Sequence, residues 1–310
     1  KGQINDDLNL LLGATYVKST GDKVLHYKSY SRSLYAQGDY QVLDWLKLII
    51  GAQYDKPDAV SGNLSPRLGA IFDLSPYWGV KTIYSSAFRD ASPLDRFIDN
   101  PAIKGDPNLQ AETIDTLDVQ LFYHRDQTNF SITAFRSKQK NIIARESGTP
   151  VQLVNRGHIE YQGLELESRT QPLPRLTLIG NTSYQRNQSS SGEEDVTYAP
   201  NTLIKLGGYY ETTRSATLGL FASYFDESAL QNTSASFQKP PAESYTLITA
   251  NLRGNLGKLV DKRSLEPYTL SLYIDNLLDE EIYFPSIHRT DVSSIPLHAG
   301  RGFYLTVKGT

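Results

Sequence analysis

The sequence contains no cysteine among its 310 residues. This absence excludes disulfide frameworks, thiol catalysis and metal sites with cysteine ligands. Methionine is also absent, so Lys1 is not a translational start and the chain is a processed product or part of a longer one. No run of 18 apolar residues occurs, which excludes a membrane-spanning helix. No signal peptide is visible.

Neither sign of charge is in excess. The chain has 31 Lys and Arg against 34 Asp and Glu, a formal net charge of −3. No basic cluster stands out in the sequence, so nucleic acid is not an expected partner. The mean hydropathy is −0.40. A value this low is compatible with a transmembrane barrel, because only every second strand residue faces lipid.

What the sequence does contain is an alternation of apolar and polar residues. In 116–123, for example, Leu117, Val119 and Leu121 alternate with polar side chains. A period of two places the apolar side chains on one face of a strand and the polar ones on the other. About fourteen such strands are predicted, at 5–16, 29–41, 46–55, 65–74, 77–87, 111–123, 127–137, 158–170, 175–186, 201–211, 215–225, 243–256, 267–275 and 301–309.

The connections between these segments alternate between short and long. The long polar connections are predicted at roughly 17–29, 55–64, 88–110, 138–157, 187–198, 226–242 and 276–299. A soluble β-sandwich produces the same side-chain alternation, so the period alone does not identify the environment. The alternating connection lengths, the long strands and the aromatic residues that end many apolar faces favour an outer-membrane barrel with short periplasmic turns and long extracellular loops.

Five groups of short motifs follow one another along the chain. They are NLSPRLGA at 63–70 with SAFRDAS at 86–92, GDPNLQAET at 105–113, NRG at 155–157 with GLELE at 163–167, IDNLLDEEIY at 274–283, and GRGFYLTV at 300–307. We interpret most of these residues as architectural, since Asp106, Pro107 and Asn108 are turn-forming residues. In this order, across about residues 60–310, the motifs resemble the C-terminal barrel region of TonB-dependent outer-membrane receptors.

The resemblance implies an all-β fold, an antiparallel transmembrane β-barrel in the bacterial outer membrane. It also implies TonB-dependent uptake of a ferric siderophore or a related iron complex, without enzymatic activity, catalytic residues, cofactor or resident metal. Barrels of this family have 22 strands, preceded by a plug domain and a TonB-contacting box, and neither is visible here. We therefore expect 1–310 to be one domain, the C-terminal portion of a receptor barrel whose missing plug contacts TonB.

Ligand contacts are expected in the long outer loops. Arginine and aromatic side chains there suit an anionic, partly aromatic metal chelate through charge-assisted hydrogen bonds and stacking. The candidate residues are Arg89, Arg96 and Phe97 in 88–110, and Tyr283, Phe284, His288 and Arg289 in 276–299. The alternative, that each is a solvated loop residue, stays open. Haem receptors of the family typically carry a His in the first of these loops, and residues 88–109 contain none, which argues against haem.

Two other functions remain open from the sequence. One is a passive, self-contained channel of about fourteen strands, and the other is a hydrolase at the barrel rim that uses Glu165 and Glu167 for acid–base chemistry. Polar lining of the lumen explains these two carboxylates equally well. The orientation itself is testable, since Leu121→Arg or Leu272→Arg would cost about 2–4 kcal/mol at the bilayer midplane and Gln120→Ala far less.

Overall fold

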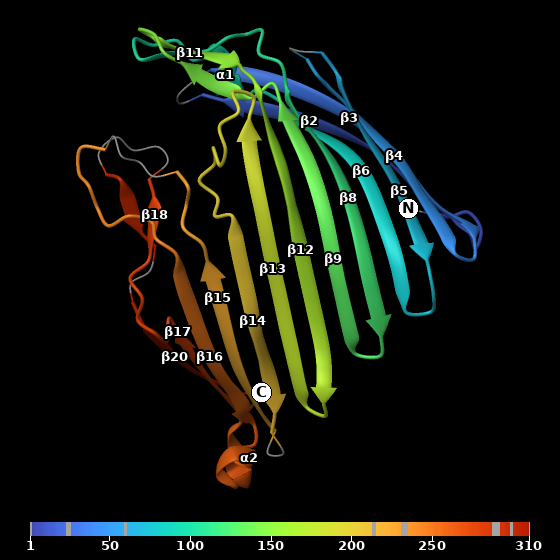
Figure 1. Cartoon of the computed structure of the whole chain (residues 1–310), viewed down its shortest axis with the longest axis vertical. Coiled ribbons are helices and arrows are strands. Elements are labelled where there is room, and N and C mark those ends of the chain that lie inside the picture. The colour runs from blue at the N-terminus through green and yellow to red at the C-terminus, as the bar shows by residue number, and fades with distance from the viewer. Residues whose placement is uncertain are drawn as a thin grey trace. The chain divides into compact units, whose positions relative to one another are not determined.

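The computed structural model describes residues 2–22, 26–58, 61–212, 215–230, 235–286, 292–297 and 300–309. Nearly all of its regular structure is β-strand (Figure 1). The described residues form a main antiparallel sheet of fifteen strands, in the order β1-β2-β3-β4-β5-β6-β8-β9-β12-β13-β14-β15-β16-β17-β20. Contacts divide the chain into two compact units, which are 1–121, 133–162 and 187–194 for the first and 122–132, 163–186 and 195–310 for the second.

Most strands of the main sheet are long. Their bounds are β1 (Gly2–Gln3), β2 (Leu8–Gly21), β3 (Tyr27–Leu43), β4 (Leu46–Pro57), β5 (Asn63–Asp73), β6 (Trp78–Arg89), β8 (Glu112–Arg125), β9 (Thr128–Lys140), β12 (His158–Leu173), β13 (Leu176–Ser189), β14 (Thr202–Glu211), β15 (Ala216–Phe225), β16 (Tyr245–Asn255), β17 (Tyr268–Asp275) and β20 (Gly302–Gly309). Each strand except β1 overlaps one of the fourteen segments that the alternation predicts, with bounds that differ by up to a few residues. The all-β antiparallel fold is therefore confirmed. β1 has two residues, too few to show a period.

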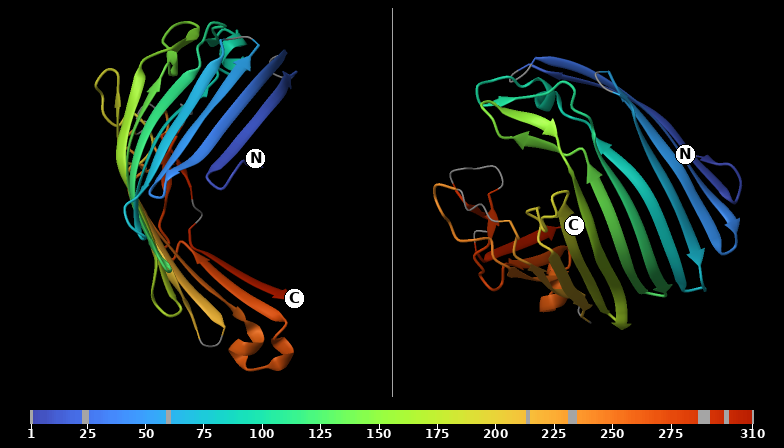
Figure 2. Two further views of the ribbon diagram at one scale, coloured as in Figure 1. Left: turned by 90° about the vertical axis from the view of Figure 1, so that its right-hand side faces the viewer. Right: turned by 45° about the horizontal axis from the view of Figure 1, so that its top comes forward.

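In the first unit, consecutive strands from β2 to β6 are joined by hairpins and lie side by side (Figure 2). β2 pairs with β3 from Leu8 opposite Tyr40 to Gly21 opposite Tyr27. The stretch predicted as a loop at 17–29 is therefore mostly strand, and its predicted length is wrong. Its polar residues continue the two strands beyond their apolar part, and polarity alone does not end a ladder of backbone hydrogen bonds.

The long connections after β6 and after β9 contain short elements of their own (Figure 1). These are α1 (Pro93–Phe97), β7 (Ile103–Lys104), β10 (Ile143–Glu146) and β11 (Val151–Asn155). A small sheet has the order β10-β11-β7, with β10 antiparallel and β7 parallel to β11. The two connections therefore fold together, which their separate polar patterns do not predict.

In the second unit, hairpins join β13 to β14, β14 to β15 and β15 to β16, and β17 pairs with β20. The connection between β16 and β17 contains α2 (Leu256–Val260) and η1 (Arg263–Leu265), at the end of these strands away from β18 (Tyr283–Pro285) (Figure 1). β18 pairs with β19 (Ser294–Pro296). The side chain of Asn255 caps α2 by accepting a hydrogen bond from the Lys258 backbone N–H at 3.0 Å.

The large apolar side chains of the strands are exposed. Leu34, Ile50 and Leu206 are 64%, 60% and 56% exposed, respectively, and similar residues occur on most strands. The buried apolar residues of the described chain are few and mostly small or in connections: Ala91, Leu109, Ala111, Leu153, Ala216, Ala235, Ala242, Tyr245 and Ile282. A water-soluble sandwich would bury its alternating apolar residues between two sheets. The strands described here do not, so the sandwich alternative is excluded.

Candidate ligand-binding loops

The first predicted ligand loop contains the short helix α1. Residues of the local sequence cap the start of this helix. The Ser92 hydroxyl accepts a hydrogen bond from the Asp95 N–H at 3.1 Å, and the Asp95 carboxylate accepts one from the Ser92 N–H at 2.9 Å. This reciprocal arrangement is a capping box. Pro93 occupies the first helical position, where its missing N–H removes no intrahelical hydrogen bond.

Gly105 allows the returning chain to lie against α1. Its N–H donates to the Ile98 carbonyl at 2.7 Å. A Cβ at this position would lie 2.5 Å from the Asp95 carbonyl oxygen and 2.7 Å from the carbonyl carbon of Arg96. Both are backbone atoms that cannot rotate away, so this position requires glycine.

A small apolar core holds the two connections together. Leu109, from the first connection, and Leu153, from the second, are both buried. The members of this core and the partly buried residues packed against it are Ala91, Leu109, Leu153, Ile98, Ile103 and Ile143. This core and the pairing of β7 with β11 hold the connections after β6 and after β9 together, so that exposed side chains on these connections have a defined position.

Arg89 is anchored by a carboxylate but is not enclosed. Its Nε donates to Glu112 Oε2 at 2.7 Å, and its Nη1 lies 3.9 Å from Asp95 Oδ2. Glu112 also accepts a hydrogen bond from the Ile143 N–H at 2.7 Å, so this buried carboxylate ties β8 to β10. The Arg89 side chain remains 57% exposed. A guanidinium has five N–H donors, so Arg89 retains donors for an incoming anion.

Arg96 occupies a different environment. It is only 6% exposed, and its Nε and Nη2 have no hydrogen-bond partner among the described residues. Burial raises the pKa of the Asp90 carboxyl, and the positive charge of Arg96 opposes that rise. The Asn63 side-chain amide donates to Asp90 at 3.3 Å. The sequence makes Arg96 a candidate for ligand contact, and the structure places its side chain among the buried residues.

The other predicted residues are divided between the units. Phe97, at the end of α1, is 46% exposed. In the second unit, Tyr283 is half-buried and Phe284 is 43% exposed, opposite Ile295 in the β18–β19 pair. The predicted candidates His288 and Arg289 lie outside the described residues.

Asn155 joins two of the sequence motifs. Its Oδ1 accepts a hydrogen bond from the Gln110 N–H at 2.7 Å. Its Nδ2 donates to the Gln110 carbonyl at 3.0 Å and to the Asn141 carbonyl at 2.7 Å. The NRG motif is therefore clamped to the GDPNLQ motif. Nothing in the local sequence around Asn155 indicates that Gln110, 45 residues earlier, is its partner.

A second clamp joins the last two motifs. Asn276 is fully buried, and its side chain accepts from the Glu280 N–H at 2.9 Å and donates to the Glu280 carbonyl at 2.8 Å. Asp279 Oδ1 accepts a hydrogen bond from the Arg301 N–H at 2.7 Å. Both Asn276 and Asp279 have positive φ, a conformation that Asn and Asp tolerate better than most residues. These motif residues hold loops, in agreement with their architectural interpretation.

Catalytic features are sparse in the part of the chain that the structure describes. Glu165 and Glu167 are exposed on β12. No group of three His, Cys, Asp or Glu side chains arranged to hold a metal occurs among the described residues.

No described helix has the length and apolar character needed to cross a membrane.

The architecture defines the class of protein. Long antiparallel strands with an exposed apolar face, and with long loops at one end and mostly short turns at the other in each unit, are typical of a transmembrane β-barrel of the outer membrane. Residues 3–277 match the family model of the TonB-dependent receptor-like β-barrel. The chain belongs to this family, and its location is the bacterial outer membrane.

Several known proteins are similar to the chain. An iron-regulated outer membrane virulence protein of Vibrio cholerae is 22% identical over 274 residues, which cover 81% of this chain and 41% of that protein. A ferrioxamine receptor of Yersinia enterocolitica is 26% identical over 179 residues, covering 56% and 24%. The chain spans about two fifths or less of the length of these relatives.

Solved structures agree on the fold. A mutant form of the ferric enterobactin receptor of Pseudomonas aeruginosa has a TM-score of 0.74 and 17% identity, covering 97% of this chain and 50% of that one. A siderophore receptor from the same organism has a TM-score of 0.73 and 19% identity, covering 97% and 51%. At these identities the likeness concerns the fold alone.

Proposed function

We propose that the protein containing this chain is a TonB-dependent receptor that takes up a ferric siderophore. The observation that carries the proposal is the family match across residues 3–277. It is supported by the names of two relatives, one iron-regulated and one a ferrioxamine receptor. TonB itself would act through a plug domain, as in other members of the family.

Within this function, we assign ligand contact in the first unit to Arg89 and Phe97. A ferric siderophore complex with net negative charge would accept hydrogen bonds from the exposed edge of the Arg89 guanidinium. The exposed Phe97 ring offers an apolar surface nearby in sequence, held by α1. Arg96 would position this loop rather than contact the ligand, because it is buried. In the second unit, Tyr283 and Phe284 are proposed to contribute aromatic surface, and His288 and Arg289 stay candidates on sequence grounds.

The experiment is uptake of radioactive iron by cells that lack the chromosomal gene and carry the complete gene on a plasmid. Ferrioxamine and ferric enterobactin represent hydroxamate and catecholate ligands. Uptake that requires both the receptor and TonB would support the proposal. Iron uptake that is independent of TonB, with high single-channel conductance of the purified protein, would contradict it and indicate a passive channel.

The role of Arg89 can be separated from its ion pair with Glu112. Arg89→Gln removes both the ion pair and the guanidinium donors, whereas Glu112→Gln removes the charge of the ion pair's carboxylate and keeps the guanidinium. We expect Arg89→Gln to weaken siderophore binding about tenfold or more and Glu112→Gln to weaken it much less. Arg125→Gln, at the end of β8 beside the short turn to β9, is the matched control. Equal losses in Arg89→Gln and Glu112→Gln would show that Arg89 only supports the loop.

A further inference from the structure

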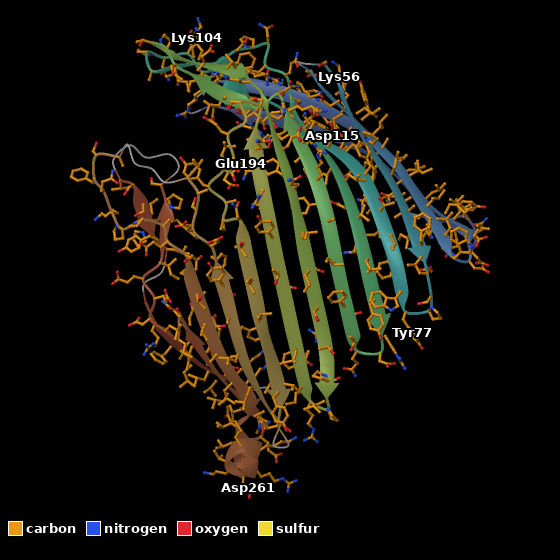
Figure 3. The ribbon with its side chains drawn as sticks, in the orientation of Figure 1. Lys56, Tyr77, Lys104, Asp115, Glu194 and Asp261 are labelled. Carbon is orange, nitrogen blue, oxygen red and sulfur yellow. The ribbon has the colours of Figure 1, made fainter. Side chains whose placement is uncertain are left out.

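The connection between β16 and β17 differs from the tight turn that joins β12 to β13 at the same end of the second unit. β12 ends at Leu173 and β13 begins at Leu176, which leaves a turn of two residues, whereas the twelve residues 256–267 separate β16 from β17. The short-turn end of outer-membrane barrels faces the periplasm. We call residues 256–267 the β16–β17 knob, which projects beyond the end of β16 where Asp261 is labelled (Figure 3).

Hydrogen bonds and close packing fix the backbone of the β16–β17 knob. The Asn255 side chain holds both ends of the knob, because it accepts from the Lys258 N–H at 3.0 Å and donates to the Glu266 carbonyl at 2.6 Å. The Lys262 N–H donates to the Gly257 carbonyl at 2.8 Å. Gly257 lies against Glu266, since a Cβ on Gly257 would be 2.7 Å from the Glu266 Cα. The knob therefore presents its side chains from a defined backbone.

Most apolar side chains of the β16–β17 knob are partly covered. Leu256, Leu259 and Leu265 are half-buried. Leu259 packs near β16, since a Cβ on the buried Gly254 would be 3.0 Å from the Leu259 Cδ1. Val260 is 55% exposed. A segment that lies in a membrane surface presents a whole apolar face to the lipid, and one exposed valine does not make such a face.

Basic side chains predominate on the exposed surface at this end. Four of them are exposed, which are Lys258, Lys262, Arg263 and, on β20, Lys308. Lys308 is opposite Thr269, the second residue of β17. The knob's two acidic residues are Asp261 and Glu266. Among the described residues, no carboxylate forms an ion pair with any of the four basic side chains. Their charges are available to an anionic partner from outside the chain.

We propose that the β16–β17 knob binds the peptidoglycan of the periplasm through the free carboxylates of its peptide stems. Lysine and arginine donate charge-assisted hydrogen bonds to carboxylates. A polymer with repeated carboxylates can engage several of these side chains at once, so that weak single contacts combine into a stronger attachment. The small exposed apolar area favours this hydrated partner over a lipid surface. The knob is at the opposite end of the strands from the proposed siderophore contacts, and the proposal does not depend on them.

The test uses the complete receptor, purified in detergent, and isolated peptidoglycan sacculi, with the bound fraction measured by co-sedimentation. The triple variant Lys258→Gln with Lys262→Gln and Arg263→Gln should weaken binding about tenfold or more. Added salt should weaken binding of the unmodified receptor, because salt screens exposed charges. Sacculi whose carboxylates have been converted to amides should bind the unmodified receptor no better than untreated sacculi bind the triple variant.

A matched control removes three positive charges near other short turns. It combines Lys47→Gln near the start of β4, Arg125→Gln at the end of β8 and Arg175→Gln in the turn between β12 and β13. This control should bind sacculi as the unmodified receptor does, and folding of each variant is checked by its heat-dependent gel mobility. Equal binding by the triple variant and the unmodified receptor would overturn the proposal. So would an equal loss in the control, which indicates general charge attraction, or knob-dependent binding to phosphatidylglycerol vesicles without binding to sacculi, which indicates a lipid site.

Discussion

Replacing Asn155 by Ala would release one connection of the first unit from the other. The substitution removes three hydrogen bonds, two to the Gln110 backbone and one to the Asn141 carbonyl. Each contributes about 0.5–1.5 kcal/mol net. Because Gln110 is exposed and its backbone groups regain water, we expect a loss near the lower end of the sum, about 2 kcal/mol.

Hydrogen exchange on the complete receptor measures this loss directly. A change of about 2 kcal/mol corresponds to roughly 30-fold faster exchange, and it should be confined to amides of 105–112 and 141–155. Asn155→Asp keeps the acceptor for the Gln110 N–H but loses both donated hydrogen bonds, so its effect should be intermediate. Unchanged protection in Asn155→Ala, or equal loss of protection throughout β2 to β6, would refute the assignment of Asn155 as a local clamp.

Three further substitutions test the loops. Gly105→Ala places a methyl group against the Asp95 backbone and should destabilise this loop by about 1–3 kcal/mol, seen as faster proteolytic cleavage within it. Asp279→Ala leaves the Arg301 N–H without its acceptor and should lower stability by about 1 kcal/mol, measured by denaturant titration. Burial raises the pKa of Asp90, so its neutral form is favoured in the folded loop. The loop should lose stability as pH rises through this raised pKa, and Asp90→Asn should flatten the pH dependence of its hydrogen exchange.

Most of the main sheet could be predicted because alternation is a local signal. Residues such as Leu117 and Val119 face one environment and their neighbours another, and a one-residue error would exchange the two faces. The short loop elements could not be predicted in the same way. β7 and β11 are too short for periodicity and form through pairing between two separate connections. The capping box at Ser92 and Asp95 is local and could have been read from the sequence.

The exposure and the contacts of the candidate site residues could not be predicted from the sequence, because they depend on residues that are distant in the sequence. Arg89 and Arg96 look alike in the sequence, yet the side chain of Arg89 is exposed and that of Arg96 is buried. No composition measure contains this information.

The central claim is that the apolar face of these strands contacts hydrocarbon. The most direct test introduces arginine at two adjacent positions of β8, Leu121 and Gln120, whose side chains point to opposite faces. Stability of the complete receptor is measured by denaturant titration in lipid vesicles. We predict that Leu121→Arg costs about 2–4 kcal/mol and Gln120→Arg less than about 1 kcal/mol. Equal costs, or a larger cost at Gln120, would contradict the orientation on which this account depends.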